Sequence, residues 1–370
     1  MNIYKELGVH PVVNAMGNRT LLGGNTPSPS VRAAMNESEE YYAFMDELSE
    51  KVGEKIADLL GIEAALVTSG TSAALVLGAA ACMAGGDDEK IEQLPNTTGM
   101  PNEFIIQRQL RLKYDRCMTI PGGVLVEVGD ERETRPEHIE EAIGPNTAGI
   151  HSIAQVVPIE GTLSLEELIR IGHAHDVPII VDAAGSVYPT ELLSKFVKMG
   201  ADLVAYGAKY YGSVNTSGLL TGRKDLVDAA YKHSFVGFEA SPLRALGRPM
   251  KMDRQDIVAA YQALKVWLAM DHEARFDSYD RRAAAMRAAL KDLTTIEFVD
   301  APNGGRGQLW IKVDAEQLGK TATDVVAELL AGNPRIWVRQ DRDEHHFNLQ
   351  FLALPEWQEQ IIVDRLRELL

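Results

Sequence analysis

Short apolar runs alternate with helical patterns between residues 64 and 222, and this alternation limits the possible folds more than any other feature of the sequence. A helix that connects two neighbouring strands usually makes them parallel, so a repeated alternation predicts a mostly parallel sheet with helices on both faces. We expect an α/β protein with seven strands, at residues 65–68, 103–106, 123–128, 148–153, 179–182, 203–206 and 218–221. In sheets of this class, ligands bind beyond the carboxyl ends of the strands.

The clearest repeat of this pattern runs from Ser164 to Asp182. Ser164 is followed three residues later by Glu167, a capping-box spacing that predicts the start of a helix. Apolar residues then recur at helical spacing, and Pro178 marks the entry to the next strand. One helix and one buried strand are therefore predicted within these residues.

The pattern changes near residue 250. The later elements that we predict are a long helix at 254–290, strands at 308–313, 336–339 and 347–352, a helix at 323–330 and a terminal helix. Near the start, residues 12–18 look extended, and the glycines and prolines of 23–29 disfavour regular structure. We therefore predict an N-terminal arm at 1–45, a large domain at 46–250 and a small α+β C-terminal domain at 251–370.

The charge balance limits the possible partners. Lys and Arg together number 37 against 53 for Asp and Glu, so the formal net charge is −16. Such a surface repels phosphate backbones and anionic membranes unless a basic patch offsets it, and no run of Lys and Arg supplies one. We expect neither nucleic acid nor a membrane as a partner. The only cysteines, Cys82 and Cys117, are too few for a disulfide framework and favour a cytoplasmic protein.

Three predicted strand ends carry residues that could bind a ligand or take part in a reaction. The first is the turn after residue 68, where Ser69, Gly70 and Thr71 lead into an Ala-rich helix. The first amides of a helix have no backbone partner and lie at the positive end of its dipole, so this turn can bind an anion such as phosphate. The alternative is a plain helix N-cap with small residues for close packing.

The second and third strand ends carry opposite charges. Asp182 ends a buried strand, where a carboxylate is costly to desolvate unless it meets a cation, a metal or several donors. Lys209 follows the next strand in a glycine-flanked turn, and a lysine amine in a partly dry crevice can attack an aldehyde. The alternatives are an N-cap role for Asp182 and a solvated loop position for Lys209.

One cofactor, pyridoxal 5′-phosphate, accounts for all three placements. The anion-binding turn suits its phosphate, Asp182 would keep its ring nitrogen protonated, and Lys209 would form a Schiff base with its aldehyde. A non-catalytic nucleotide-binding regulatory module is a rival interpretation, although the chain lacks the GxGxxG turn of dinucleotide sites. A second rival is a protein that keeps the cofactor only as a structural element.

The chain also resembles the fold-type I pyridoxal phosphate-dependent enzymes, within them the subgroup related to seryl-tRNA selenium transferase. The segments that carry the resemblance are residues 12–17, 68–71, 125–129, 160–182 and 247–253. The resemblance implies a transferase-like, mostly parallel seven-stranded sheet covered by helices, with a smaller C-terminal domain. Two features depart from the pattern: Tyr206 stands where members often have serine, and residues 212–216 replace a Gly-Gly-Pro-Gln-type stretch.

By this resemblance, Lys209 is the Schiff-base lysine and Asp182 is the partner of the ring nitrogen. Further residues that we place in the cofactor site are Ser69, Gly70, Thr71, Ala184 and His151, although a histidine satisfied in the core is an equal alternative for His151. Gln107, Arg108 and Gln109 end another strand at the same edge, where they would cover the ring or form a solvated face.

Candidate substrate ligands are Arg339, for a carboxylate, and Arg19, for a phosphate or carboxylate. His345 and His346 stand beside acidic residues, but a charged hairpin turn explains them better than a metal site, so no metal is expected.

The resemblance implies chemistry at the α-carbon of an amino acid. Members close to this chain in size resemble D-glucosaminate-6-phosphate ammonia-lyase, so we expect a lyase that eliminates water and ammonia from an amino acid or amino-sugar acid. Transamination, racemisation and a selenium transferase-like reaction remain alternatives. Fold-type I enzymes usually build each site at a subunit interface, which implies a homodimer or larger homo-oligomer, with Ser213, Asn215 and Thr216 as donors to a neighbour's phosphate.

Overall fold

The chain forms two compact units in the computed structural model, which describes residues 3–301, 304–341 and 343–370. The larger unit spans Pro27–Ala269. The smaller unit combines Met1–Thr26 with Met270–Leu370. The first 26 residues therefore group with the last 101 in the smaller unit, while the predicted domain bounds separated an arm at 1–45 from a domain at 251–370.

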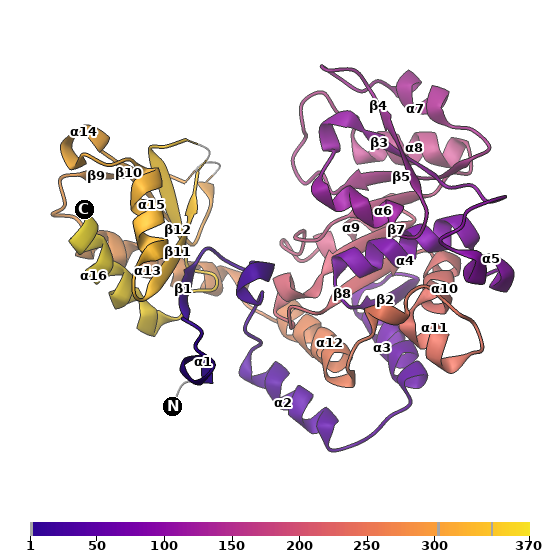
Figure 1. The fold of residues 1–370 in the computed structure, drawn as a ribbon, viewed down its shortest axis with the longest axis horizontal. Coiled ribbons are helices and arrows are strands. Elements are labelled where there is room, and N and C mark those ends of the chain that lie inside the picture. Colours follow the sequence, from indigo (N-terminus) through magenta and orange to yellow (C-terminus); the bar gives the residue numbers. More distant parts are fainter. Residues whose placement is uncertain (1–2, 302–303, 342) are drawn as a thin grey trace. The chain divides into compact units, whose positions relative to one another are not determined.

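The larger unit is built on a seven-stranded sheet (Figure 1). Its strands, in spatial order, are β2 (Ala64–Thr68), β8 (Gly218–Gly222), β7 (Leu203–Gly207), β6 (Ile179–Asp182), β5 (Thr147–Ile153), β3 (Glu103–Gln107) and β4 (Val124–Val128). Only β8 runs antiparallel to its neighbours. The predicted mostly parallel sheet, with its seven strands, is confirmed.

Helices pack around this sheet. They are α2 (Pro29–Glu39), α3 (Met45–Leu60), α4 (Thr71–Ala84), α5 (Asp88–Gln93), α6 (Arg116–Thr119), α7 (Pro136–Ala142), α8 (Leu165–Ala174), α9 (Leu192–Met199), α10 (Lys224–His233), α11 (Phe235–Ala240) and α12 (Arg254–Leu268). The predicted helix start at Ser164 is confirmed, because the Ser164 side chain accepts a hydrogen bond from the Glu167 amide at the start of α8.

Two helices show that both faces of the sheet are covered. A Cβ added to Gly78 of α4 would touch Ile180, while one added to Gly172 of α8 would touch Ile179 and Ile150. Neighbouring residues of a strand point to opposite faces, so α4 and α8 lie on opposite sides of β6. Glycine lets each helix approach the strands closely.

The smaller unit has a five-stranded sheet in the order β1 (Val12–Ala15), β11 (Arg335–Gln340), β12 (His346–Gln350), β10 (Gln308–Val313) and β9 (Ile296–Val299). Its helices are α1 (Ile3–Glu6), α13 (His272–Ala289), α14 (Ala315–Leu318), α15 (Ala322–Ala331) and α16 (Glu359–Leu369). The strand β1 pairs in parallel with β11, with Val13 opposite Ile336. The N-terminal segment is therefore part of this sheet.

One predicted element is wrong. The expected helix over 254–290 is two helices, α12 and α13, with a break at residues 269–271. The Asp271 side chain accepts a hydrogen bond from the Ala274 amide at 2.9 Å and so starts a new helix as an N-cap. The helical composition on both sides of Asp271 concealed this break in the sequence pattern. No described helix is long and apolar enough to cross a membrane.

Candidate active site

The carboxyl end of β6 places Asp182 at the edge of the larger sheet. Its carboxylate accepts a hydrogen bond from the Ala184 amide at 3.0 Å, and in the sheet register it lies beside Ala205 of β7. Burial raises the pKa of Asp182, and the Ala184 hydrogen bond only partly opposes this effect. A half-buried carboxylate that accepts this bond can still accept from a cationic or N–H partner.

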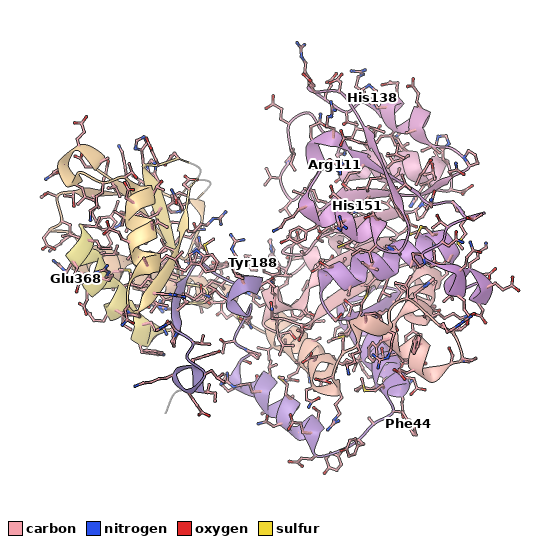
Figure 2. All side chains as sticks on the ribbon, in the orientation of Figure 1. Phe44, Arg111, His138, His151, Tyr188 and Glu368 are labelled. Carbon is pink, nitrogen blue, oxygen red and sulfur yellow. The ribbon has the colours of Figure 1, made fainter. Side chains whose placement is uncertain are left out.

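His151, labelled in Figure 2, lies on the neighbouring strand β5. In the sheet register it is opposite Ile180. Its side chain is buried, and Nδ1 is 3.3 Å from the Ile180 carbonyl oxygen. Burial lowers the pKa of His151, while the negative charges of Asp182 and Asp115 act in the opposite direction. The structure therefore brings His151 into the electrostatic surroundings of Asp182 as a buried imidazole whose neutral form is favoured.

The turn between β2 and α4 has the geometry of an anion-binding site. Gly70 has a φ of 124°, which glycine adopts without strain, and the Thr68 hydroxyl donates to the Gly70 carbonyl oxygen at 3.1 Å. The helix begins at Thr71, and its first backbone bond runs from the Ala74 amide to Gly70. The amides that precede Ala74 in α4 consequently have no helical acceptor and can serve an anion.

The strand β8 packs closely against the turn between β2 and α4. A Cβ added to Gly218 of β8 would lie 2.4 Å from the Gly70 carbonyl carbon and 2.7 Å from the Thr71 amide nitrogen. Only a glycine at 218 permits so close an approach of two backbones. The antiparallel pairing of β2 with β8 ends at this contact, between Thr68 and Gly218. The end of β8 therefore packs against the turn and the first residue of α4.

Lys209 lies in the short 3₁₀ segment η4 (Ala208–Tyr211) that follows β7, and its side chain is buried at 9% exposure. Its Nζ lies 5.1 Å from the centroid of the Tyr210 ring. The Gly207 amide donates to the Ala184 carbonyl oxygen at 2.9 Å, which ties the lysine segment to the residues that follow Asp182.

Gly207 also touches the anion-binding turn. A Cβ added at Gly207 would lie 3.0 Å from Thr71 Oγ1 and 3.0 Å from Tyr210 Cδ2. The structure therefore brings three segments together at one sheet edge: the turn at 69–71, the end of β6 at 182–184 and the lysine segment at 207–210. They are more than 100 residues apart in the chain at their extremes, and their residues fit the phosphate, ring nitrogen and aldehyde of pyridoxal phosphate.

The residues that end β3 have other partners. The amide side chain of Gln107 is buried and bonds both ways to the Leu163 backbone, at 3.1 and 2.7 Å. Arg108 is ion-paired with Glu127, and Gln109 donates to the Asp130 carbonyl oxygen. These contacts hold loops of the larger unit to the sheet.

Arg19 and Arg339 lie in the smaller unit, and both are exposed. Arg339 is on β11, opposite Asn348 of β12. Arg19 follows β1, and its backbone amide donates to the Gly17 carbonyl oxygen at 2.8 Å. Their substrate role stays a prediction.

The loop after the lysine segment is fastened within its own unit. The Ser217 hydroxyl donates to Ser213 at 2.8 Å, and the Thr216 hydroxyl donates to Asp256 at 2.9 Å. A buried side-chain oxygen of Asn215 has no hydrogen-bond partner. The role of these residues toward a neighbouring subunit also stays a prediction.

His346 Nδ1 bonds to the carboxylate of Asp343, at 2.9 and 3.0 Å, within the turn that precedes β12. Within the described parts of the chain, no group of three or more His, Cys, Asp and Glu side chains is arranged to hold a metal ion. A cavity of about 540 Å³ lies elsewhere in the larger unit, between α3, β2 and α10, and none of the predicted site residues lines it.

Sequence reasoning missed three residues near Asp182 and Lys209. Tyr210 has no signal in the sequence beyond its place next to Lys209. Asp115 is buried and accepts hydrogen bonds from Arg111 Nε at 2.7 Å and from the Leu112 amide at 2.8 Å. Cys117 bonds to Ser72, and burial raises its pKa. Asp115 and Cys117 come from a segment without strand periodicity, so only the tertiary structure reveals their position.

Comparisons with known proteins identify the family of the chain. Residues 45–276 match the family model of L-seryl-tRNA selenium transferase. The chain is 32% identical over 380 residues to a 5′-C-glycyluridine monooxygenase-decarboxylase from a Streptomyces species, with 99% of this chain and 92% of the relative covered. It is 30% identical over 381 residues to a D-glucosaminate-6-phosphate ammonia lyase from Salmonella typhimurium, covering 100% of this chain and 98% of the relative.

Solved structures show the same fold. A structure of D-glucosaminate-6-phosphate ammonia-lyase aligns with a TM-score of 0.88 at 28% identity, covering 100% of this chain and 98% of that chain. An aspartate aminotransferase from Thermus thermophilus aligns with a TM-score of 0.54 at 20% identity, covering 100% of this chain and 94% of that chain. The second likeness extends the shared fold to aminotransferases.

Proposed function

Because the chain belongs to the L-seryl-tRNA selenium transferase family of fold-type I pyridoxal phosphate-dependent enzymes, we propose that it is a lyase. Its substrate would be an amino acid joined to a sugar skeleton, from which it eliminates water and ammonia. The relative that suggests this reaction is named an ammonia lyase and matches this chain over nearly its whole length.

The names of two relatives support the substrate class. One acts on D-glucosaminate 6-phosphate, an amino-sugar acid that carries a phosphate. The other acts on 5′-C-glycyluridine, in which an amino acid is attached to the sugar of a nucleoside. Both molecules combine an α-amino acid with a hydroxylated ring or chain, so we extend this combination to the substrate of this protein.

We assign the cofactor contacts by chemistry and position. Lys209 would bind the aldehyde, and Asp182 would hold a proton on the ring nitrogen. The phosphate would lie on Ser69, Gly70 and Thr71. Ala184 and His151 would complete the pocket, Ala184 by positioning the Asp182 carboxylate through its amide and His151 by limiting water access beside it.

One observation carries this proposal: the Gly207 amide donates to the Ala184 carbonyl oxygen, and a Cβ at Gly207 would lie 3.0 Å from Thr71 Oγ1. The segments with the amine, the carboxylate and the anion-binding turn therefore meet at a single residue. The bound cofactor supplies an electron sink for the substrate α-carbon. The Lys209 amine is then the nearest general base for the α-proton, and its ammonium form can return that proton to the leaving hydroxyl group.

Three further assignments belong to the proposal. Arg339 and Arg19 would bind the substrate carboxylate or phosphate. The protein would act as a homodimer or larger homo-oligomer, with Ser213, Asn215 and Thr216 directed to a neighbour's phosphate. We place it in the cytoplasm, because both cysteines are free thiols.

Borohydride reduction tests the cofactor assignment directly. Protein incubated with pyridoxal phosphate is reduced, digested and mapped by mass spectrometry, and we expect the cofactor mass on the peptide that contains Lys209. Lys209→Ala should lose this label and the visible absorption of the bound cofactor. Lys195→Ala, which removes an exposed lysine of α9, should keep both. A wild-type protein that takes up no label would end the proposal.

The reaction type needs a separate measurement. Ammonia and keto acid are assayed together with D-glucosaminate 6-phosphate, free amino acids and amino-sugar acids. Release of ammonia with a keto acid and no amine acceptor supports the lyase, whereas a requirement for an acceptor supports transamination. Loss of optical activity without ammonia would instead support racemisation.

A selenium transferase-like reaction would require tRNA. The net charge of −16 opposes binding of a phosphate backbone, so we expect no retention of tRNA on a filter even at low salt. Salt-dependent retention of tRNA would contradict this expectation and favour the transferase alternative.

A further inference from the structure

The ring of Tyr210 occupies a position in which it can control the Lys209 amine. It lies under Lys209 Nζ, 5.1 Å from nitrogen to ring centroid. Its Cδ2 and Cε2 lie 3.0 and 3.1 Å from the point where a Gly207 Cβ would stand. The ring therefore lies close to both the lysine amine and Gly207, and a Gly207 Cβ would also approach Thr71.

A second lysine–tyrosine pair in the chain provides a comparison. Lys113 Nζ lies 5.2 Å from the centroid of the Tyr114 ring, at nearly the same distance. Tyr114 is 52% exposed, whereas Lys209 is only 9% exposed. An aromatic face attracts an ammonium ion more strongly when the pair is shielded from water, so the Lys209 pair is the stronger of the two.

Given the role proposed above for Lys209, we propose that Tyr210 is a positioning residue that holds the Lys209 side chain and favours its ammonium form by a cation–π contact. A lysine side chain has four rotatable bonds, and contact with a ring restricts them when the amine is not attached to the cofactor. The Tyr210 ring keeps Lys209 Nζ at the sheet edge where the anion-binding turn and Asp182 lie.

This contact has a consequence for elimination. When Lys209 removes the α-proton, the C–H bond breaks, an N–H bond forms, and the electron pair stays with the substrate. That pair then expels the β-hydroxyl group, which leaves as water after it takes the proton from the Lys209 ammonium. The ring of Tyr210 stabilises the ammonium between these two steps, so one nitrogen can serve as base and then as acid.

Chemical labelling of the cofactor-free full-length protein tests the inference without any substrate. Acetic anhydride at a limiting concentration modifies only neutral amines, and mass spectrometry compares Lys209 with the exposed Lys195 in one sample. We expect Tyr210→Leu to label Lys209 about fivefold faster than wild type at neutral pH, because the ring no longer favours the ammonium. Tyr210→Phe keeps the ring and should match wild type.

The pH profile separates this effect from a simple opening of the site. Loss of the ring should move the rise in labelling to lower pH, whereas wider access would raise the rate by one factor at every pH. The helix and strand packed most closely against η4 are α12, whose titratable groups are Arg254, Asp256, Tyr261 and Lys265, and β8, which has none. These groups, Asp182 on β6 and Tyr211 beside the ring are the same in all variants.

Two controls complete the design. Tyr114→Leu, at the exposed pair, should leave Lys209 labelling unchanged. If Tyr210→Leu does not fold, Tyr210→Met, which also removes the ring, replaces it. Equal Lys209 profiles in wild type and in a folded variant without the ring would overturn the inference, even where borohydride reduction places the cofactor on Lys209.

Discussion

Asp182 carries an electrostatic cost in the absence of a cationic partner. Burial raises its pKa, so the folded protein binds this proton more tightly than the unfolded chain does. The stability that this proton contributes is present at pH values below the unfolded pKa of an aspartate. It is lost as the pH rises through the higher folded value, so at neutral pH the carboxylate destabilises the cofactor-free protein.

Replacement of Asp182 by Asn should therefore separate stability from function. We expect Asp182→Asn to stabilise the cofactor-free protein at neutral pH by about 1 kcal/mol, because it removes a half-buried charge at nearly constant shape. Catalysis should fall by at least about 100-fold, because the ring nitrogen loses its acidic partner. Thermal unfolding and initial rates check the two effects. Asp58→Asn, at an exposed site of α3, should change neither.

The sequence pattern indicates some of the site residues and gives no sign of others. Asp182 and Lys209 stand at strand ends, where a charged side chain is conspicuous against an apolar run. Tyr210 is not conspicuous, because tyrosine is common at strand ends and its use depends on the direction of its ring. Asp115 and Cys117 reach the neighbourhood of Asp182 through tertiary packing, which has no periodic signal in the sequence.

The contact between β8 and the start of α4 is the most constrained feature among the elements. A methyl group on Gly218 would overlap the backbone of Gly70 and Thr71, which cannot move as a flexible side chain can. We expect Gly218→Ala to lower the free energy of unfolding by about 2 kcal/mol or more and to weaken pyridoxal phosphate binding. Gly144→Ala, where the new Cβ meets nothing within 4 Å, is the matched control.

Denaturant unfolding and cofactor titration measure these effects. Unchanged cofactor affinity in Gly218→Ala would show that the turn does not bind the phosphate, while the loss of stability would still report the backbone contact.

The strand β1 provides a second test among the elements. Val13 is buried in the core of the smaller unit, opposite Ile336 of β11, whereas its neighbour Val12 points to the other side of the sheet and is half-buried. Val13→Asp should destabilise the smaller unit by about 3 kcal/mol, because it buries an unpaired charge. Val12→Asp should lower the stability of the smaller unit much less. The rate at which a protease cleaves within residues 270–370 compares the two variants.

The strands of the larger sheet were predictable because parallel strands are buried on both faces and stand out as continuous apolar runs. The break between α12 and α13 was not, since Asp271 is one polar residue within a helical composition. The pairing of β1 with β11 was also hidden. It joins residues more than 300 positions apart, and no local pattern records such a contact.

Each unit of the molecule has its own hydrophobic core. One core gathers residues of the larger sheet and of α4 and α10, and the other gathers residues of β1, the C-terminal strands and their helices. Residues 27–269 therefore contain a complete core, and we expect this fragment to fold when it is produced alone. Circular dichroism and cofactor titration of the fragment check this. An unfolded fragment would show that the larger unit depends on the smaller.

The membership of β1 in the smaller sheet also affects the order of events during synthesis. The ribosome releases β1 first, but its partner β11 appears only after the whole of residues 27–269 has been made. The larger unit can therefore fold on the nascent chain while β1 is still unpaired. A chaperone that binds short hydrophobic strands would act on β1 during this interval. If synthesis stopped before β11, the larger unit could still form its core, but β1 would stay unpaired and could aggregate.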